Sequence, residues 1–166
     1  MKEINQIELR KLLCYNPLSG NFMWRVSVNR RIRIGSIAGS VVRDRRGKSY
    51  THIKIHGQSY LAHRLAFLYI KGRWPREIDH KDGKGLNNKW LNLRECTHSQ
   101  NAANQGPRKD NKLGVKGVSY YSGSGKYVAQ IGIYGKKTHL GYFNTVEAAT
   151  RAYKKAAKKH YGEFTP

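Results

Sequence analysis

A polar, basic stretch at Asn104–Lys112 interrupts the chain and most limits what it can fold into. Its residues, Asn-Gln-Gly-Pro-Arg-Lys-Asp-Asn-Lys, favour turns and loops over helices or strands. A chain of 166 residues forms one medium domain or two small ones. We therefore predict a linker at 105–112 between an N-terminal portion, 1–104, and a C-terminal portion, 113–166.

The N-terminal portion has patterns of helix and strand that predict an α+β fold with a β-rich extension at its start. Apolar residues recur at roughly helical spacing from Ile4 to Leu12, and Asn16-Pro17 ends that pattern. Later segments alternate apolar and polar side chains, which is typical of half-buried strands. The expected elements are a helix over 3–15, strands over 22–26, 40–43, 50–55 and 58–61, and a helix over 62–70.

The C-terminal portion has the pattern of a three-stranded antiparallel sheet followed by one helix. Ser122-Gly123-Ser124-Gly125 and Gly135-Lys136 separate three alternating segments, and short gaps that contain glycine favour hairpins. Apolar side chains then share one face of the last segment at helical spacing. The expected strands cover 115–121, 127–134 and 137–143, and the expected helix covers 145–161.

The charge of the chain indicates a polyanionic partner. Lys and Arg number 32 against 10 Asp and Glu, a formal net charge of +22. Such a surface attracts nucleic acid or an anionic membrane, but no apolar run approaches the ~20 residues that a spanning helix needs. We therefore expect nucleic acid and no membrane. The first six residues lack the apolar core of a signal peptide, so we expect a cytoplasmic protein with Cys14 and Cys96 reduced.

Asp79 and His80 form the strongest candidate for chemistry in the chain. Hard divalent ions prefer carboxylate and amide oxygens, and a neutral His is a good general base near pH 7. Asp79 can therefore bind a metal ion while His80 activates a water, with further amide side chains at Asn92 and Asn101. Adjacent side chains of a strand point to opposite faces, so the pair must lie at a strand end or a bulge to act on one site.

Acidic residues are scarce in the chain, yet four of the ten lie within nineteen positions around this pair. A surface that only binds DNA would avoid carboxylates, because they repel phosphate, whereas a metal ion removes that conflict. The alternative is structural, with Asp79 in a turn and His80 an ordinary loop histidine. We would prefer that alternative for an isolated pair, but the charge and the downstream Asn residues weaken it. The four acidic residues are Glu77, Asp79, Asp82 and Glu95.

Six motifs follow one another in order between Ala62 and Asn104. They are His63-Arg64-Leu65, Trp74-Pro75, Ile78-Asp79-His80, Asn87-Asn88, Asn92-Leu93-Arg94 and Ser99-Gln100-Asn101-Ala102-Ala103-Asn104. This order resembles the HNH endonucleases of phages and mobile introns, which include homing enzymes. The resemblance implies a central ββα-metal domain, with its core at about 60–104. In that fold two strands joined by a loop, and then a helix, surround one divalent ion, Mg²⁺ or Mn²⁺.

The resemblance also implies a role for each matching residue of the central motifs. His80 would be the general base, and Asp79 would be a metal ligand. Asn101, on the following helix, would be the second metal ligand. Asn92 would take part in catalysis by fixing the loop and orienting the base.

Two further features of this segment leave alternatives open. His63 and Arg64 would support the site or contact the scissile phosphate, or else His63 only begins a helix and Arg64 is solvated. The loop between the strands carries Lys84-Gly85, where the resembled family more often has Arg. This departure puts any role of a loop Arg in doubt.

The C-terminal portion carries its own motifs. They are Gly117-Val118-Ser119-Tyr120, Tyr127-Val128-Ala129-Gln130-Ile131, His139-Leu140-Gly141-Tyr142-Phe143, Glu147-Ala148-Ala149, Ala152-Tyr153 and His160-Tyr161-Gly162-Glu163-Phe164. These motifs resemble the AP2 DNA-binding domain, which implies a sheet laid in the major groove of DNA. Lys predominates over Arg, which favours phosphate contact over base readout. The candidates for DNA contact are Tyr121, Lys126, Gln130, Lys136 and Lys137, together with Arg64 of the central segment.

These features together predict a metal-dependent endonuclease of double-stranded DNA, acting as a monomer or weak dimer in the cytoplasm of a bacterial or phage-infected cell. Nicking and double-strand cutting stay open, as do a homing enzyme and a phage accessory nuclease. The first alternative is a non-catalytic, sequence-specific DNA-binding regulator. The second is a protein that binds or cleaves RNA, which the basic segments with aromatic residues also permit.

Overall fold

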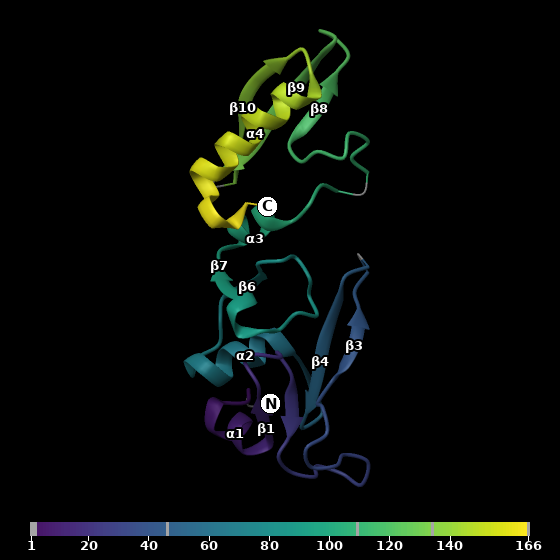
Figure 1. Cartoon of the computed structure of the whole chain (residues 1–166), viewed down its shortest axis with the longest axis vertical. Helices are drawn as coiled ribbons and strands as arrows, with labels where there is room; N and C mark the ends of the chain where they lie inside the picture. The colour runs from purple at the N-terminus through teal and green to yellow at the C-terminus, as the bar shows by residue number, and fades with distance from the viewer. Residues whose placement is uncertain (1–2, 46, 109, 134, 166) are drawn as a thin grey trace. The chain divides into compact units, whose positions relative to one another are not determined.

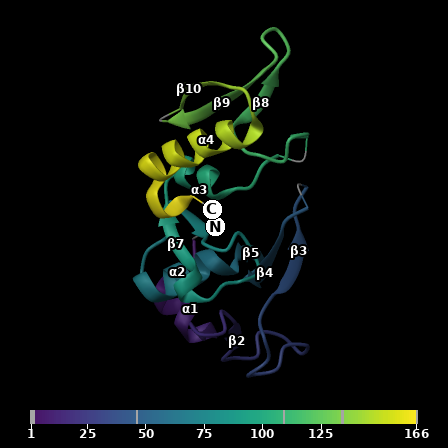
Figure 2. The same ribbon diagram turned by 45° about the horizontal axis from the view of Figure 1, so that its top comes forward.

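A computed structural model gives the structure of the chain and describes residues 3–45, 47–108, 110–133 and 135–165. Figure 1 shows the helices and strands along the chain, and Figure 2 shows the same ribbon turned by 45°. Among the described residues, no helix is both long enough and apolar enough to cross a membrane.

The chain folds as two compact units, Met1–Cys96 and Thr97–Pro166. The predicted linker at 105–112 lies within the second unit, and its Lys109 falls outside the described residues. The boundary between the units precedes the helix that carries Asn101. By its contacts, this helix groups with the C-terminal sheet and helix.

The first unit begins with helix α1 (Gln6–Leu12), whose first turn is capped by the Asn5 side chain. The predicted helix over 3–15 is wrong beyond Leu12, because the chain continues as strand β1 (Leu13–Tyr15), paired with β2 (Phe22–Trp24). Leu13 and Tyr15 are both buried while Cys14 between them is only half-buried. Alternate residues of β1 therefore point to the core, as in any strand. The helical spacing of apolar residues in α1 runs on into these positions, so the sequence pattern does not reveal where the helix ends.

A three-stranded antiparallel sheet follows, with the order β3-β4-β5, and leads directly into helix α2. Its strands are β3 (Ser40–Arg43), β4 (Ser49–Ile55) and β5 (Gln58–Leu61), and α2 covers Ala62–Lys71. The sequence predictions for these strands and this helix are confirmed. Gly72 ends α2 with φ 75°, a left-handed conformation that favours glycine.

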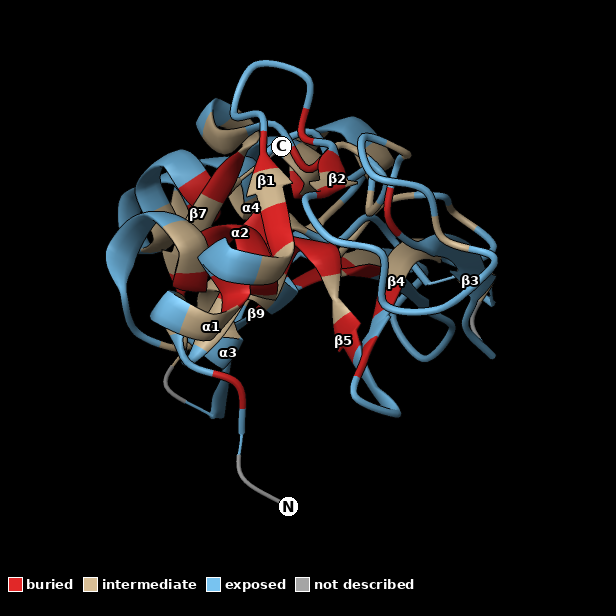
Figure 3. Cartoon of the chain, turned by 90° about the horizontal axis from the view of Figure 1, so that it is seen from below, coloured by how far each residue is buried: buried red, intermediate tan, exposed pale blue. Residues whose placement is uncertain are grey.

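The core of the first unit gathers residues from the α1–β1–β2 segment, the sheet and α2. Leu9, Leu13, Ile53 and Leu65 are completely buried within it. Figure 3 colours these buried parts red along β1 and α2. Helix α2 therefore has a fixed position against the sheet, and its first turn presents His63 and Arg64.

Strands β6 (Glu77–His80) and β7 (Leu93–Cys96) form a separate antiparallel pair in the same unit. The loop between them ends in a short 3₁₀ helix, η1 (Trp90–Asn92). These two strands and their loop hold Asp79, His80 and Asn92.

The second unit begins with helix α3 (His98–Asn104), which carries Asn101. The Thr97 hydroxyl accepts from the Gln100 backbone N–H, and the Gln100 side-chain oxygen accepts from the Thr97 backbone N–H, which completes a capping box. At the other end, the Lys116 ammonium donates to the carbonyl oxygens of Ala102, Ala103 and Gln105. Lys116 thereby ties α3 to the segment that precedes the C-terminal sheet.

The C-terminal sheet has the order β10-β9-β8, and helix α4 packs on it. Its core contains Val118, Ala129 and Ala149. The predicted antiparallel meander and helix are confirmed, while Tyr134, in the predicted middle strand, falls outside the described residues. The elements are β8 (Val118–Tyr121), β9 (Lys126–Ile133), β10 (Lys136–Phe143), α4 (Val146–Tyr161) and a short 3₁₀ helix, η2 (Gly162–Phe164).

Candidate active site

Asp79 and His80 lie at the end of β6, and both are buried, with 5% and 7% of their surface exposed. In the strand pair, Asp79 lies opposite Arg94 and His80 lies opposite Leu93. His80 is the last residue of β6. The pair thus lies at a strand end, which is one of the two places where adjacent side chains can act on one site. Burial at a strand end holds both side chains in place.

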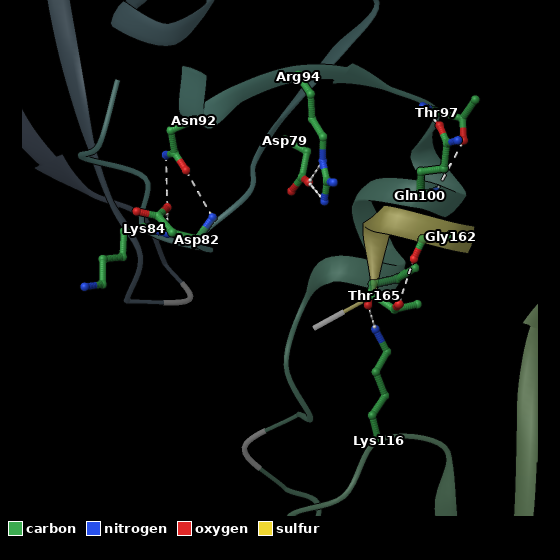
Figure 4. A network of polar contacts seen from close by, with 11 residues as sticks. Asp79, Asp82, Lys84, Asn92, Arg94, Thr97, Gln100, Lys116, Gly162 and Thr165 are labelled. Atoms are coloured by element: carbon green, nitrogen blue, oxygen red, sulfur yellow. Dashed lines mark hydrogen bonds and ion pairs between the residues drawn. The ribbon is translucent and has the colours of Figure 1, made fainter. Parts of the chain in front are cut away.

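The Asp79 carboxylate forms a buried ion pair with Arg94 (Figure 4). The guanidinium of Arg94 donates from Nε at 2.8 Å and approaches from Nη2 at 2.7 Å, both to the same oxygen, Oδ2 of Asp79. A buried carboxylate without a cationic partner would be costly, so Arg94 makes the charged form of Asp79 tenable in this position. Sequence reasoning included Arg94 in a motif but assigned it no role.

His80 is held by Asn88 and His63. Nε2 of His80 lies 3.3 Å from Oδ1 of Asn88, and the His63 ring meets the His80 ring edge-on with 4.9 Å between centroids. Burial lowers the pKa of His80, although the Asn88 contact and the nearby carboxylates of Asp82 and Asp79 act in the opposite direction. The imidazole is therefore neutral near pH 7, which is the form that can accept a proton.

Asn92 binds the loop that follows β6 near its start, at Asp82 (Figure 4), and in its middle, at Asn87. Its amide nitrogen donates to Oδ1 of Asp82 at 3.0 Å and to the carbonyl of Asn87 at 2.7 Å. Its amide oxygen accepts from the Asp82 backbone N–H at 3.1 Å. Burial of Asp82 raises the pKa of its carboxyl, but hydrogen bonds from Asn87, the Lys84 backbone and Asn92 outweigh this and lower it. These contacts support the loop-fixing role that the resemblance implies for Asn92.

The N-terminal β1–β2 segment holds the same loop at Asn88. The Tyr15 hydroxyl donates to the Asn88 carbonyl at 2.6 Å, and the Trp90 N–H donates to the Pro17 carbonyl at 2.9 Å. A side chain at Gly20 would lie 2.4 Å from the Asn88 backbone, so this turn requires glycine. Sequence reasoning missed Asn88 as a site residue, although Asn87-Asn88 was among the motifs and could have indicated it.

His63 and Arg64 have different surroundings on the first turn of α2. His63 is buried, and burial, followed by the nearby charges of His80, Arg64 and His52, lowers its pKa to about 3. Its Nδ1 finds no hydrogen-bond partner among the described residues. Tyr50 completes the group, with its ring centroid 5.8 Å from that of His63. A supporting role for His63 is thus compatible with its position against His80.

Arg64 contacts the turn that precedes β6. Its guanidinium donates to the carbonyl oxygens of Pro75 at 3.0 Å and Arg76 at 3.4 Å, and it stacks 5.7 Å from the Trp74 ring centroid. These contacts position the turn that leads to Asp79. They also show that Arg64 is not the solvated side chain of the structural alternative, and its contact with DNA stays a prediction.

A metal ion at Asp79 would have few protein ligands. Among the described residues, no three His, Cys, Asp or Glu side chains lie close enough together to hold an ion. Asn101, the predicted second ligand, lies on α3 in the second unit, and its role stays a prediction. A single carboxylate with amide, water and phosphate oxygens suits Mg²⁺, which keeps several waters and binds through one or two carboxylates.

The candidates for DNA contact in the second unit are all exposed. By the strand register, Tyr121, Lys126, Gln130 and Lys137 lie on the sheet face opposite the buried Ala129, whereas Lys136 shares the other face with Ile133. The register adds two residues that sequence reasoning missed on the first face, His139 and Tyr142, which lie opposite Gln130 and Val128. Only the pairing of the strands could assign them to it.

Residues 60–103 match the sequence profile of the HNH endonuclease family. This segment is similar to HNH endonuclease domains. It contains His63, Arg64, Asp79, His80 and Asn92, so the expected family is confirmed for the central part of the chain. The match ends before the C-terminal sheet, and the AP2-like resemblance of residues 113–166 therefore stays a prediction.

A protein named as an uncharacterized HNH endonuclease, from Acanthamoeba polyphaga mimivirus, is 34% identical to the chain over 105 residues. The alignment covers 61% of this chain and 54% of that protein, so the chain spans about half the length of this relative. No solved structure matches the chain significantly. The likeness to HNH endonucleases thus rests on sequence comparison.

Proposed function

We propose that the protein is a metal-dependent DNA endonuclease in which His80 is the general base. The observation that carries this proposal is the neutral, buried His80 beside a charge-paired Asp79 at one strand end of the HNH domain. An isolated loop histidine would have neither the fixed orientation nor the lowered pKa. The structural alternative for the Asp79-His80 pair is therefore disfavoured.

The contacts of His80 indicate which nitrogen accepts the proton. The amide nitrogen of Asn88 is directed to the Leu86 carbonyl, so its Oδ1 faces Nε2 of His80. An amide oxygen accepts a hydrogen bond, which places the proton of the neutral imidazole on Nε2. Nδ1 then carries the lone pair and is the atom that takes the proton from water. Asn88 thus selects the tautomer, and the His63 ring restricts rotation of the base.

Asp79 would hold the divalent ion, Mg²⁺ or Mn²⁺, that HNH nucleases generally use. When bound, such an ion offsets charge on the phosphate and on the leaving oxygen. The Asp79 carboxylate fits this task because the buried ion pair with Arg94 orients it through one oxygen, Oδ2. The resemblance adds the amide oxygen of Asn101. With so few protein ligands, we expect the ion to bind weakly until DNA phosphates complete its shell.

The proposed substrate is double-stranded DNA. The net charge of +22 brings phosphate to a protein whose site region holds four of its ten acidic residues. One such site cuts one strand in each encounter, so double-strand cutting would need a dimer or two successive nicks.

Cleavage of supercoiled plasmid with Mg²⁺, Mn²⁺ or EDTA tests the proposal. We expect conversion to open circular or linear DNA only with metal, and a loss of about 100-fold or more in the His80→Ala variant, with DNA binding retained. His160→Ala, at an exposed histidine of α4, is the matched control and should cleave like the wild type. If His80→Ala nicks as fast as the wild type, the assignment of the base is wrong. Tight DNA binding without cleavage in any metal would instead favour the non-catalytic regulator.

A further inference from the structure

The turn between β3 and β4 concentrates positive charge in the first unit. Its sequence is Arg43-Asp44-Arg45-Arg46-Gly47-Lys48, with four cations among six residues, and Arg46 falls outside the described residues. The side chains of Arg43, Arg45 and Lys48 are exposed. This turn, here named the basic turn, is therefore a candidate surface for a polyanion.

Asp44 fixes the conformation of the basic turn. Its backbone N–H donates to the Lys48 carbonyl at 2.7 Å, and its Oδ1 accepts from the Lys48 N–H at 2.8 Å. Nε of Arg43 donates to the Gly47 carbonyl at 3.2 Å. The carboxylate of the turn thus serves the backbone. The basic turn therefore presents its cations from a closed loop whose conformation is set before any ligand binds.

The strand that follows the basic turn packs directly on the loop between β6 and β7 (Figure 1). A side chain at Gly85 of that loop would lie 2.5 Å from the Ser49 carbonyl oxygen and 2.6 Å from the Tyr50 ring. The loop thus approaches the β4 backbone so closely that only glycine fits at this position. Because the basic turn directly precedes β4, this contact fixes the turn beside the loop.

Tyr50 and Lys48 connect the basic turn to the base of the candidate site. The Tyr50 ring centroid lies 6.3 Å from that of His80. Lys48 precedes Tyr50 by two residues, which is about 7 Å of extended chain. Burial is the main cause that lowers the pKa of His80, and the positive charge of Lys48 acts in the same direction. The Lys48 ammonium is therefore within electrostatic range of His80.

A cation beside the base has a use in phosphodiester hydrolysis. Negative charge increases on the non-bridging oxygens of the phosphate as water attacks, and a group that is positioned there stabilises the transition state more than the ground state. An ammonium carries three donors on a flexible four-carbon stem, which suits a phosphate. Since His80 activates the water, a cation beside His80 lies on the side of the attacking oxygen.

We propose that the basic turn is a phosphate-binding arm, in which the Lys48 ammonium binds the scissile phosphate while Arg43 and Arg45 bind neighbouring phosphates. Lys48 keeps its proton throughout and acts through charge alone. Such contacts position the duplex and read no bases. The role of Lys48 in cleavage rests on the proposed endonuclease function, whereas backbone binding by the turn needs only a DNA partner.

Nicking of supercoiled plasmid with Mg²⁺, by the full chain in saturating excess over DNA, tests the role of Lys48. At saturation the rate reflects chemistry and not affinity. Lys48→Ala should lower this rate by about 100-fold, and Lys48→Arg, which keeps the charge, should lose less than about tenfold. Lys54→Ala, at an exposed lysine of the same strand, is the matched control and should keep the wild-type rate.

Binding of a short labelled duplex in EDTA, followed by fluorescence anisotropy at several salt concentrations, tests the arm without cleavage. Lys48→Ala and Arg45→Ala should each lower the slope of log affinity against log salt by about 0.9, the value for one lost phosphate contact. Lys54→Ala should keep the wild-type slope. Circular dichroism verifies that each variant is folded, and recovery in Lys48→Arg separates loss of charge from loss of structure.

Three outcomes overturn the proposal and are separable from failure of the nuclease. A wild-type nicking rate in Lys48→Ala would reject its contact with the scissile phosphate while the enzymatic proposal stands. Equal losses in Lys48→Ala and Lys54→Ala would show a general effect of net charge. Should the wild type bind DNA without cutting it in any metal, the salt slopes still decide, and unchanged slopes in Lys48→Ala and Arg45→Ala would reject the arm.

Discussion

Arg94 and Asp79 show how closely the candidate site depends on single residues. The guanidinium is only 10% exposed and the carboxylate only 5%, so water screens their attraction weakly. Arg73 and Glu95 form the corresponding exposed pair in the same unit, through two hydrogen bonds. The first unit therefore has the same kind of ion pair both in a buried place and at the surface, which allows a direct comparison.

Arg94→Met should destabilise the first unit by about 3 kcal/mol or more, because it removes the cation from a buried carboxylate. Arg73→Met should cost less than about 1 kcal/mol, because water screens the exposed pair. Urea unfolding followed by circular dichroism measures both. Asp79→Asn in the Arg94→Met background should recover part of the loss. Equal costs for the two Arg variants would show that the ion pair at Asp79 does not support the site.

His63 should make the stability of the first unit depend on pH. Burial lowers its folded-state pKa to about 3, below the ordinary value of 6.5, so the folded state disfavours its protonation. The unfolding free energy therefore carries no penalty from His63 above about pH 6.5. As pH falls from there toward 3, it decreases by up to about 1.4 kcal/mol per pH unit for this one proton. His80, whose pKa is also lowered, acts in the same direction.

Urea unfolding at several values between pH 7.5 and pH 4 measures this effect, and His63→Phe should flatten the profile. The matched control is His56→Asn, at an exposed histidine with φ 48°, a conformation that Asn tolerates. The control should keep the wild-type slope. An unchanged slope in His63→Phe would contradict the assignment.

At the scale of elements, the loop between β6 and β7 is held from two sides. Asn92 binds its first and middle residues from within, and the β1–β2 segment holds Asn88 from outside. The loop that carries Asn88, the contact of His80, therefore depends on a segment about seventy residues earlier in the chain. The N-terminal extension thus has at least this structural task.

Asn92→Asp should open the loop, because the new carboxylate would face the Asp82 carboxylate in place of an amide that donates to it at 3.0 Å. We expect a loss of about 1–3 kcal/mol in unfolding free energy and a fall in cleavage rate. Adding Asp82→Asn to the Asn92→Asp variant places an amide donor opposite the new carboxylate. The double variant should recover much of the lost stability and of the lost cleavage rate. A double-mutant cycle measures the coupling, and additive effects would contradict a direct Asn92–Asp82 interaction.

At the scale of the whole molecule, charge and acidity are unevenly distributed along the sequence. Seven of the ten acidic residues precede Thr97, and four of them lie within nineteen positions that include Asp79 itself. The remaining surface is strongly basic, and like charges repel one another in any folded unit. Nucleic acid or salt would relieve that repulsion.

The unfolding temperature should therefore rise from about 0.1 M to about 1 M NaCl, as the Debye length falls from about 10 Å to about 3 Å. A short DNA duplex at low salt should raise it as well, because it binds the folded state. Differential scanning fluorimetry measures both changes. A fall in unfolding temperature with salt would show that attractive ion pairs, and not net repulsion, dominate the surface.

The sequence alone determined the type and order of most elements, because apolar periodicity and glycine turns are local signals. It also indicated His80, Asp79 and Asn92, because their spacing resembles that of a known family. It failed at Leu13–Tyr15, where a helical pattern ran into residues that pair with β2. Only pairing with the partner strand decides between helix and strand at these residues.

The tertiary structure alone decided which distant residues meet at the candidate site. Nothing local joins Tyr15 to Asn88 or His63 to His80, and no spacing marks Arg94 as the ion-pair partner of Asp79. It likewise assigned Tyr142 and His139 to the face of the C-terminal sheet that carries Gln130, through strand register. Contacts between residues far apart in the chain depend on how the elements pack, and the side-chain period of a single strand cannot specify which strand lies beside it.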